Sequence, residues 1–433
     1  MNAEALRAGT APRLRPAVAP ILAVTTWAVL LLAGHRLGAD LEAVDPRVHV
    51  GAPPLVGSAD LRVGLRVLPV LALALAAVFW GPQLAERLSF QRLLVASWAG
   101  LLTWMTVLAA TDGLSTLATP LTRRFEYLAV VPRIDTPGSF LHGFVDQLST
   151  YPTHVKGHPP GLPLLLWSLD QIGLGGRWPA TILVLAVGAL VAPAALVALR
   201  ELSDNGAARR AAPFLVLTPG AVWMATSADA LFAGVFAVGV ALFAVACGCR
   251  DRRGDLISLT AGLALGATLA LSYSAVPAGA IVLAVALARR RLRPLLIAGG
   301  GVLVVLGALA AGGFWWLDGL RATRDLALGG VLSRRPYGDF LVISLAAFAL
   351  AAGPAAAAGL ARLRSAPGRV LIAGALAGLI AADLSGLSRG ETERIWLPFL
   401  PWVMVGAAGL GRGWLAAQAG LALVIQVGVS SPW

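Results

Sequence analysis

Long apolar runs alternate with short polar segments along most of this chain. Runs of about 18 or more apolar residues recur from end to end, which is typical of a polytopic helical membrane protein. We therefore expect an all-α transmembrane bundle of about 13 spans. The predicted spans lie near 16–34, 67–82, 92–111, 178–199, 211–227, 229–249, 255–272, 275–288, 294–316, 339–361, 369–387, 395–411 and 413–429.

The polar segments differ in length. The long ones are 35–66, 112–160 and 317–338, and a short polar patch covers 388–394. Segment 112–160 contains several prolines and amphipathic pieces, which favours helices that lie in the membrane interface. Segment 161–175 is apolar but too short to cross a bilayer, so we expect a helix embedded in one face.

Arginines in the short loops predict the orientation. With a cytoplasmic N-terminus, every arginine-bearing short loop lies inside, as the positive-inside rule requires. These arginines are residues 87, 92, 200, 209, 210, 250, 252, 253, 289, 290, 291, 293, 362, 364, 369 and 412. The polar segments then face outward in a multi-pass plasma-membrane protein. We divide the chain into 1–91, a cytoplasmic tail with two spans, and a transmembrane core, 92–433.

Composition excludes a soluble protein. Hydrophobic residues make up 58% of the chain and charged residues 13%, against about 25% charged in an ordinary soluble domain. The net charge of +12 comes from loop arginines, so it indicates topology and contact with membrane lipids rather than nucleic-acid binding. Cys247 and Cys249 have no metal-ligand spacing. We expect no metal site built from protein ligands.

Lys156 is the only lysine of the chain and lies in the run His154-Val155-Lys156-Gly157-His158-Pro159-Pro160-Gly161. An ammonium group and imidazole donors can hold a phosphate. The alternative is that Pro-Pro ends one element while Lys156 reaches the lipid headgroups. Because lysine and histidine are scarce elsewhere, we favour substrate binding by Lys156, His154 and His158.

Two aspartates follow or precede predicted spans at the outer face. Asp112 comes directly after the third span and could act as a general base toward an acceptor hydroxyl; it could equally be an ordinary helix-ending residue. Asp229 could join it in catalysis or cap the following helix. Asp146, in the long polar segment, is a further candidate for substrate binding.

The last polar patch is dense in charge. Glu391, Glu393, Arg389 and Arg394 lie between two predicted spans, close to the intramembrane Asp383. The charges could neutralise one another within the loop, or an arginine could grip a phosphate. All four are candidate substrate-binding residues.

The pattern resembles the GT-C superfamily of membrane glycosyltransferases, especially protein O-mannosyltransferases and bacterial aminoarabinose transferases. The matching features, in order, are Asp112, the Lys156–Gly161 run and Ser227-Ala228-Asp229-Ala230-Leu231; the Ser-Arg-Gly-Glu-Thr-Glu-Arg run is similar to late loops of actinobacterial members. The resemblance covers roughly 92–250. The family often has Asp-Glu where this chain has Asp112-Gly113, so a divalent cation stays open and no other cofactor is expected.

The resemblance implies a polyprenyl-phosphate sugar donor and a glycan, lipid or protein acceptor at the extracytoplasmic face. Asp112 would deprotonate the acceptor hydroxyl for attack on the anomeric carbon with inversion. Lys156, His158 and an outer arginine would stabilise the departing phosphate. A secondary transporter or flippase of lipid-linked sugars is the alternative, which Asp383 would suit. A non-catalytic partner in cell-envelope synthesis is a third.

Overall fold

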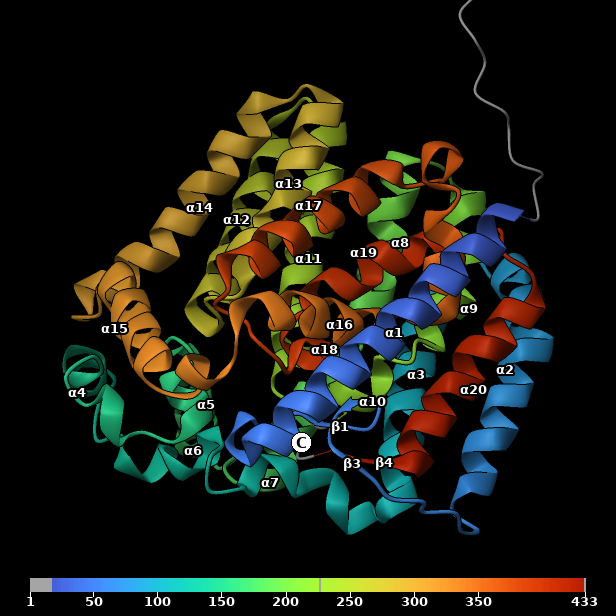
Figure 1. The fold of residues 1–433 in the computed structure, drawn as a ribbon. Helices are drawn as coiled ribbons and strands as arrows, with labels where there is room; N and C mark the ends of the chain where they lie inside the picture. The colour runs from blue at the N-terminus through green and yellow to red at the C-terminus, as the bar shows by residue number, and fades with distance from the viewer. Residues whose placement is uncertain (1–17, 226, 432–433) are drawn as a thin grey trace, which may run out of the picture.

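The computed structural model describes residues 18–225 and 227–431, and within them the chain is a helical bundle (Figure 1). The tail predicted at the N-terminus lies outside the described residues. The long helices are α1 (Val18–Val44), α2 (Val67–Arg87), α3 (Phe90–Ala109), α7 (Arg177–Gly188), α8 (Val191–Leu202), α9 (Asn205–Val216), α11 (Asp229–Gly248), α12 (Arg252–Leu271), α13 (Ala275–Arg289), α14 (Leu292–Ala311), α15 (Trp316–Gly329), α16 (Tyr337–Leu360), α17 (Arg369–Ser385) and α20 (Arg412–Gly428).

Short helices and strands connect them. The short α-helices are α4 (Pro137–Gly143), α5 (Thr153–Lys156), α6 (Gly161–Gln171), α10 (Ala221–Met224), α18 (Thr392–Ile395) and α19 (Leu400–Met404). The 3-10 helices are η1 (Pro46–Val48), η2 (Ala110–Asp112), η3 (Leu114–Ala118), η4 (Pro120–Thr122), η5 (Tyr127–Ala129), η6 (Val131–Arg133), η7 (Leu148–Thr150), η8 (Val331–Arg334), η9 (Leu363–Ser365), η10 (Leu397–Phe399) and η11 (Val405–Ala407). Strands β1 (Gly51–Ala52) and β2 (Leu55–Val56) pair, as do β3 (Ser58–Ala59) and β4 (Val429–Ser430), both antiparallel.

The expected fold class, an all-α polytopic membrane bundle with short helices in the long polar segment, is confirmed. Eight helical stretches in the described part of the chain have the length and composition to cross a bilayer, counting α7 with α8. The stretch α11 is the most buried of them, at 78% of its apolar window, and α1 the least, at 6%. The bundle is therefore centred on α11, while α1 lies at its margin.

Two predicted spans are broken. The span expected at 211–227 is α9, which begins earlier at Asn205 and ends at Val216, followed by α10. Pro219-Gly220 separates them, because proline cannot continue a helix. The span expected at 395–411 consists of α18, η10, α19 and η11. Its irregular backbone lies inside the protein, where Trp396 and Trp402 are fully buried, as irregular structure at membrane depth requires.

The helix junctions separate into two ends of the bundle. At one end, contacts join the arginine-bearing junctions: Arg209 donates to the carbonyls of Ala85 and Leu88, and Arg291 donates to that of Cys249. At the other end the polar segments meet, including the part that holds α4, α5 and α6 (Figure 1). We call these the arginine end and the polar end.

The polar end is also where the first polar segment meets the end of the chain. Ser58 pairs with Ser430 and Ala59 with Val429, and the backbone N–H of Arg62 donates to the carbonyl of Val427. Residues far apart in sequence thus form one wall at the end of α3.

Candidate active site

A buried polar network begins at the first residue of α11. Asp229 is 3% exposed, and its carboxylate accepts a hydrogen bond from the Ser227 hydroxyl at 2.6 Å. The Ser227 oxygen in turn accepts from the backbone N–H of Asp229 at 3.1 Å. A carboxylate at a helix N-terminus is favoured by the helix dipole. The sequence around 227–229 therefore holds this negative charge in a fixed place.

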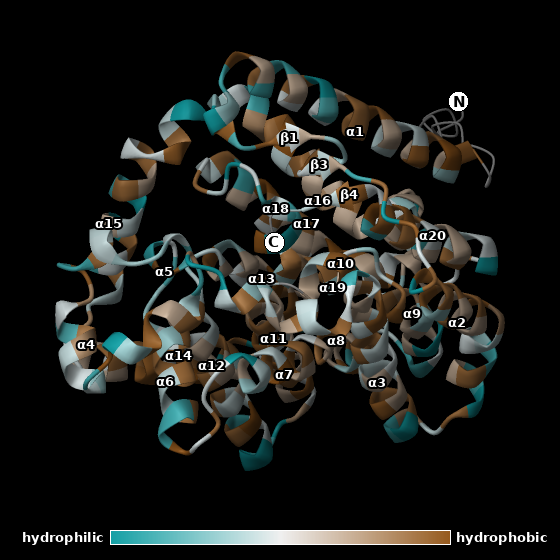
Figure 2. Cartoon of the chain, turned by 90° about the horizontal axis from the view of Figure 1, so that it is seen from below, coloured by the Kyte–Doolittle hydropathy of each residue, from teal (hydrophilic) through white to brown (hydrophobic). Residues whose placement is uncertain are grey.

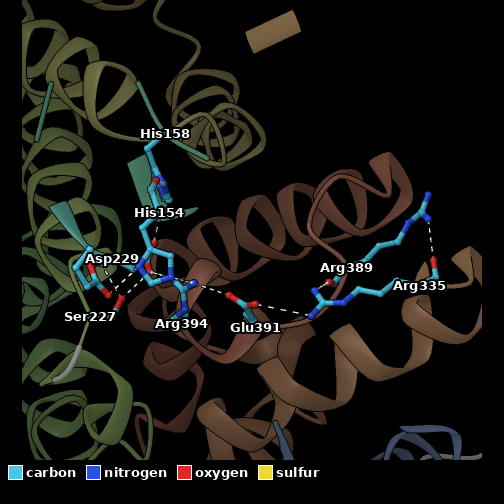
Figure 3. A network of polar contacts seen from close by, with 9 residues as sticks. His154, His158, Ser227, Asp229, Arg335, Arg389, Glu391 and Arg394 are labelled. Carbon is cyan, nitrogen blue, oxygen red and sulfur yellow. Dashed lines mark hydrogen bonds and ion pairs between the residues drawn. The ribbon is translucent and has the colours of Figure 1, made fainter. Parts of the chain in front are cut away.

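Arg394, on α18, is the centre of the network (Figure 3). Its guanidinium group donates to Asp229 Oδ2 at 2.5 Å and to the carboxylate of Glu391, three residues earlier. Gly390 and Glu391 both have a positive φ, so the chain turns sharply before α18. Burial opposes the charge of Arg394, but the Asp229 and Glu391 carboxylates outweigh it and raise the pKa of Arg394. The group stays a cation.

Both histidines of the lysine run contact this network. His154 Nδ1 lies 2.7 Å from Glu126 Oε1, and His154 Nε2 lies 3.3 Å from Arg394 Nη2. Because arginine can only donate, Nε2 accepts there, and the hydrogen of a neutral ring is then on Nδ1. His158 Nδ1 bonds the His154 carbonyl oxygen at 2.7 Å, and its Nε2 faces Asp229 Oδ1 at 3.9 Å.

Aromatic side chains close the network on the side of α11. The ring of Tyr127 lies edge-on to that of His158 with centroids 5.7 Å apart, and Phe232 contacts both rings. Burial, together with the Asp229 and Glu126 charges, raises the pKa of the Tyr127 hydroxyl well above its ordinary value. The Tyr127 hydroxyl thus stays protonated and uncharged at the edge of the network.

On its other side the network continues toward Arg389. Glu391 lies 3.8 Å from Arg335 Nη2, and Arg335 donates to the carbonyl of Val48 and to that of Arg389. Arg389 donates to two further carbonyl oxygens, of Leu332 and Arg335. Burial opposes ionisation of Glu391, but the charges of Arg394 and Arg335 outweigh it, so its pKa is lowered. The arginines thus join the loops before α16 and α18.

Lys156 and Asp146 lie outside these contacts, whereas the charge of Glu393 acts on Arg335 of the network. Lys156 is half-buried at the end of α5, where its carbonyl accepts from Thr323 Oγ1 at 3.0 Å. In the described part of the chain, its ammonium group has no hydrogen bond or ion pair. Asp146 is exposed on the turn between α4 and η7. Glu393 is 2% exposed, one residue before Arg394.

Asp112 lines a separate pocket at the end of α3. The pocket has a volume of about 310 Å³, and Arg123, Trp223, Gln426 and Ser431 are among its walls. Arg62 Nη1 contacts Asp112 Oδ2 at 2.7 Å, and Gln426 Nε2 lies 3.3 Å from the same oxygen. The Asp112 side chain keeps 33% of its surface exposed. A ligand in the pocket can therefore reach this carboxylate.

A narrow crevice lies between the Asp112 pocket and the buried network, and its lining includes a residue from each. Pro120 lines both the pocket and this crevice, whose far wall includes Ser227. Ser227 is the partner of Asp229. The structure thus brings Asp229, His154, His158, Arg394 and Glu391 into one network. Asp112 lies in a separate pocket, on the other side of this crevice.

Sequence reasoning missed Arg62, Glu126 and Gln426, and it singled out Arg335, together with Arg334, only as a weaker candidate for gripping a phosphate. Arg62 is 50 residues from Asp112 and Gln426 is 314 residues away, and no local spacing could connect them. Arg335 and Glu126 had a weak signal, because each is a charged residue in a polar segment of an otherwise apolar chain. Within residues 18–225 and 227–431, no group of three or more His, Cys, Asp or Glu side chains could hold a metal ion.

Comparisons with known proteins add little to this picture. No protein-family model matches the chain, and no curated protein sequence does. Among solved structures, the chain is similar to ArnT from Cupriavidus metallidurans, whose crystal structure has undecaprenyl phosphate bound. The TM-score is 0.41 and the identity 16%, over 71% of this chain and 59% of that one. No role is assigned to any residue on the strength of this likeness.

Proposed function

We propose that the protein is a membrane glycosyltransferase that moves a sugar from a polyprenyl-phosphate donor to an acceptor hydroxyl. The observation that carries the proposal is the Asp112 pocket. It is a cavity of about 310 Å³ with mixed polar and apolar walls at the end of a membrane helix, and a partly exposed carboxylate lines it. Such a cavity suits a hydroxylated acceptor, and the carboxylate suits a general base.

In the proposed reaction, Asp112 takes the proton of the acceptor hydroxyl. The acceptor oxygen forms a bond to the anomeric carbon while the bond from that carbon to the phosphate oxygen breaks. The electron pair leaves with the polyprenyl phosphate, and a single displacement inverts the anomeric configuration. The growing phosphate charge needs a cation, and Lys156 is the candidate because its ammonium group has no hydrogen bond or ion pair with any residue that the structure describes.

The buried network would position these groups rather than react. Asp229 is 3% exposed and bound by Ser227 and Arg394, so it has little capacity to accept a further proton. Through Arg394 and the two histidines it ties α11 and α18 to the lysine run. We therefore assign Asp229, His154, His158, Glu391 and Arg394 to holding the site together, and Arg389 and Glu393 to the same loop.

The proposed orientation places the arginine end in the cytoplasm and the polar end outside. The arginine-bearing junctions all lie at one end, which is the distribution that the positive-inside rule relates to the cytoplasm. The donor's lipid would remain in the bilayer while its phosphate reaches Lys156 at the outer interface. A cysteine-accessibility experiment on intact cells, with single cysteines at Asp146 and at Arg364, tests this orientation.

A secondary transporter or flippase is the second candidate, because Asp383 is 8% exposed on the apolar helix α17. Ionisable groups within membrane helices often mark transport paths. In the described residues, however, the charged side chains gather at the two ends of the bundle rather than at its middle, and the carboxylates and histidines of the candidate site lie at the polar end. Movement of a lipid-linked sugar across vesicles without a glycosidic product would favour this candidate.

The test of the transferase is an assay with Asp112→Asn. Purified protein is incubated with a panel of polyprenyl-phosphate sugars and acceptors, and transferred sugar and its anomeric configuration are measured. Loss of a general base predicts a fall in rate of about 100-fold or more. Asp135→Asn, which removes an exposed carboxylate of the same polar segment, serves as the control. Equal rates for wild type and Asp112→Asn would remove Asp112 as the base.

A further inference from the structure

A second cavity lies at the arginine end of the bundle, between α2, α3 and α9. Its volume is about 300 Å³, and its walls include Leu73, Trp80, Leu88, Leu93, Trp104 and Val216. Two polar groups of its lining already have partners, since the Ser97 hydroxyl donates to the Leu94 carbonyl and the Trp104 indole donates to the Thr218 carbonyl. We call this cavity the groove. Its lining suits an apolar ligand.

Gly81 has no side chain to fill the groove, which leaves room for a ligand. A Cβ placed on Gly81 would be in ordinary van der Waals contact with Pro213, at 3.7 Å, and because Gly81 lines the groove a larger side chain here would occupy part of it. On α2 the lining extends from Leu73 to Leu88, which is about 22 Å along a helix. One leaflet of a bilayer core is about 15 Å thick. The groove is thus long enough for one acyl chain of a single leaflet.

Positive charge surrounds the end of the groove. Arg87, Arg92 and Arg210 are exposed and lie within two residues of the lining residues Ala85, Leu93 and Ala212 respectively. A fourth arginine, Arg209, is already committed to carbonyls at the end of α2. The neighbouring Asp204 carboxylate caps α9 by accepting from the Ala207 N–H. The exposed Glu86, next to Arg87, and Asp204, whose carboxylate interacts with Arg210, offset part of the charge, but four arginines against these two carboxylates leave an excess of two positive charges beside the apolar groove.

We propose that this groove binds an anionic glycerophospholipid. One acyl chain would lie between α2, α3 and α9, and the phosphate would sit among Arg87, Arg92 and Arg210. Basic pockets between membrane helices are a recurring way to bind anionic headgroups. The proposal does not depend on the transferase proposal, because it concerns the other end of the bundle.

The position of the groove argues against the donor lipid as its occupant. Asp112 and Arg92 are at opposite ends of α3 and η2, about 30 Å apart along the helix. A donor whose phosphate lies near Lys156 at the polar end could not place the same phosphate among the groove arginines. The ligand therefore belongs to the leaflet at the arginine end.

The experiment is a lipid titration of the purified full chain, followed by native mass spectrometry. Phosphatidylglycerol and phosphatidylcholine with identical acyl chains are compared. The wild type should retain phosphatidylglycerol at least about tenfold more strongly. The triple variant R87Q/R92Q/R210Q should lose this preference. The matched control R362Q/R364Q/R369Q removes three exposed arginines from another junction of the same end and should keep it.

Occlusion of the groove supplies a second readout. Gly81→Phe should reduce retention of both lipids. In the wild type, a phosphatidylglycerol with a photoreactive acyl chain should label peptides of α2 and α9, which keeps the test open if Gly81→Phe fails to fold. Equal retention of the two lipids by the wild type, or equal loss in the control triple, would overturn the proposal. Displacement of phosphatidylglycerol by undecaprenyl phosphate at equal affinity would also overturn it, in favour of the donor lipid.

Discussion

At the scale of single residues, the pair between Asp229 and Arg394 sets the energetics of the polar end. Both side chains are at most 5% exposed, and each ion depends on the other for compensation. Removing one partner of a buried ion pair leaves an unpaired charge in a medium of low polarity. Removing one of the two side chains should therefore destabilise the protein more than replacing both of them with neutral residues.

We expect Arg394→Met to lower the free energy of unfolding by about 3–5 kcal/mol. The double variant Asp229→Asn with Arg394→Met should lose less than the sum of the two single variants, because Asp229 is no longer left as an unpaired charge and Glu391 keeps its contact with Arg335. Thermal unfolding of the four proteins in one detergent measures this. Strictly additive losses would show that the two side chains do not depend on each other.

Glu391 gives the network a defined response to acid. Arg394 and Arg335 outweigh the effect of burial and lower its pKa below the ordinary value of 4.5. The unfolded chain then binds the proton more readily than the folded one. The stabilisation is complete above the ordinary value and is lost as the pH falls through the lowered one.

Glu391→Gln should therefore make stability less dependent on pH below about 4.5. The measurement is the melting temperature of both proteins across an acid pH series. Asp146→Asn, which removes an exposed carboxylate, should leave the slope of the wild type unchanged. An unaltered slope in Glu391→Gln would contradict the assignment.

At the scale of elements, α16 carries a break that another helix repairs. Gly353 has a φ of 78° inside α16 and precedes Pro354. The buried Gln418 of α20 accepts from the Ala355 N–H at 3.1 Å and donates to the Ala352 carbonyl at 2.9 Å. Backbone groups freed by a kink in a membrane helix need such partners. Gln418 thus supplies the hydrogen bonds that the kinked backbone of α16 requires.

Gln418→Leu should lower the free energy of unfolding by about 1–3 kcal/mol for each backbone group left unpaired. Gln426→Leu, elsewhere on the same helix, is the comparison, because its side chain contacts Thr111 and Asp112 but no kinked backbone. Differential scanning fluorimetry on both variants measures the difference. A loss no larger for Gln418 than for Gln426 would argue against the repair.

The same scale shows which elements the sequence could predict. Long apolar runs predicted helices such as α2, α12 and α14 to within a few residues, because length and hydropathy together define a membrane helix. The interruptions at 217–220 and at 396–399 were missed. In both places the average hydropathy stays high while proline breaks the backbone, so a window average does not register the break.

At the scale of the whole molecule, polar and charged groups are sorted to two ends of an apolar bundle. Figure 2, seen from below, shows hydrophilic colour on parts of α5 and α15 and hydrophobic colour along many of the other helices. The sequence predicted this sorting, since it follows from loop composition. It did not predict which polar residues meet, because Asp229 and Arg394 are 165 residues apart and their pairing depends on helix packing.

Arg62 connects helix packing to the position of the proposed base, Asp112. It holds Asp112 while donating to the carbonyls of Gln426 and Val429, so it links three distant parts of the chain. Arg62→Gln should reduce kcat about tenfold or more, with the donor KM unchanged, because the base is then misplaced.

Arg62→Lys should recover only part of the rate, since an ammonium group keeps the charge but not the forked geometry. Steady-state kinetics with the transferase assay separates kcat from KM. Arg47→Gln, which breaks the exposed pair with Asp45, is the control. A donor KM that rises while kcat stays constant would show that Arg62 serves binding instead.

The pairing of β3 with β4 has a consequence for biosynthesis. The cavity around Asp112 gains Gln426, Val429 and Ser430 as walls only after the ribosome has made residues 426–430. Until then Asp112 lacks its Gln426 contact, and Arg62 lacks the Gln426 and Val429 carbonyls that hold it in place. The proposed base would therefore reach its final position only after β4 has been made and has paired with β3.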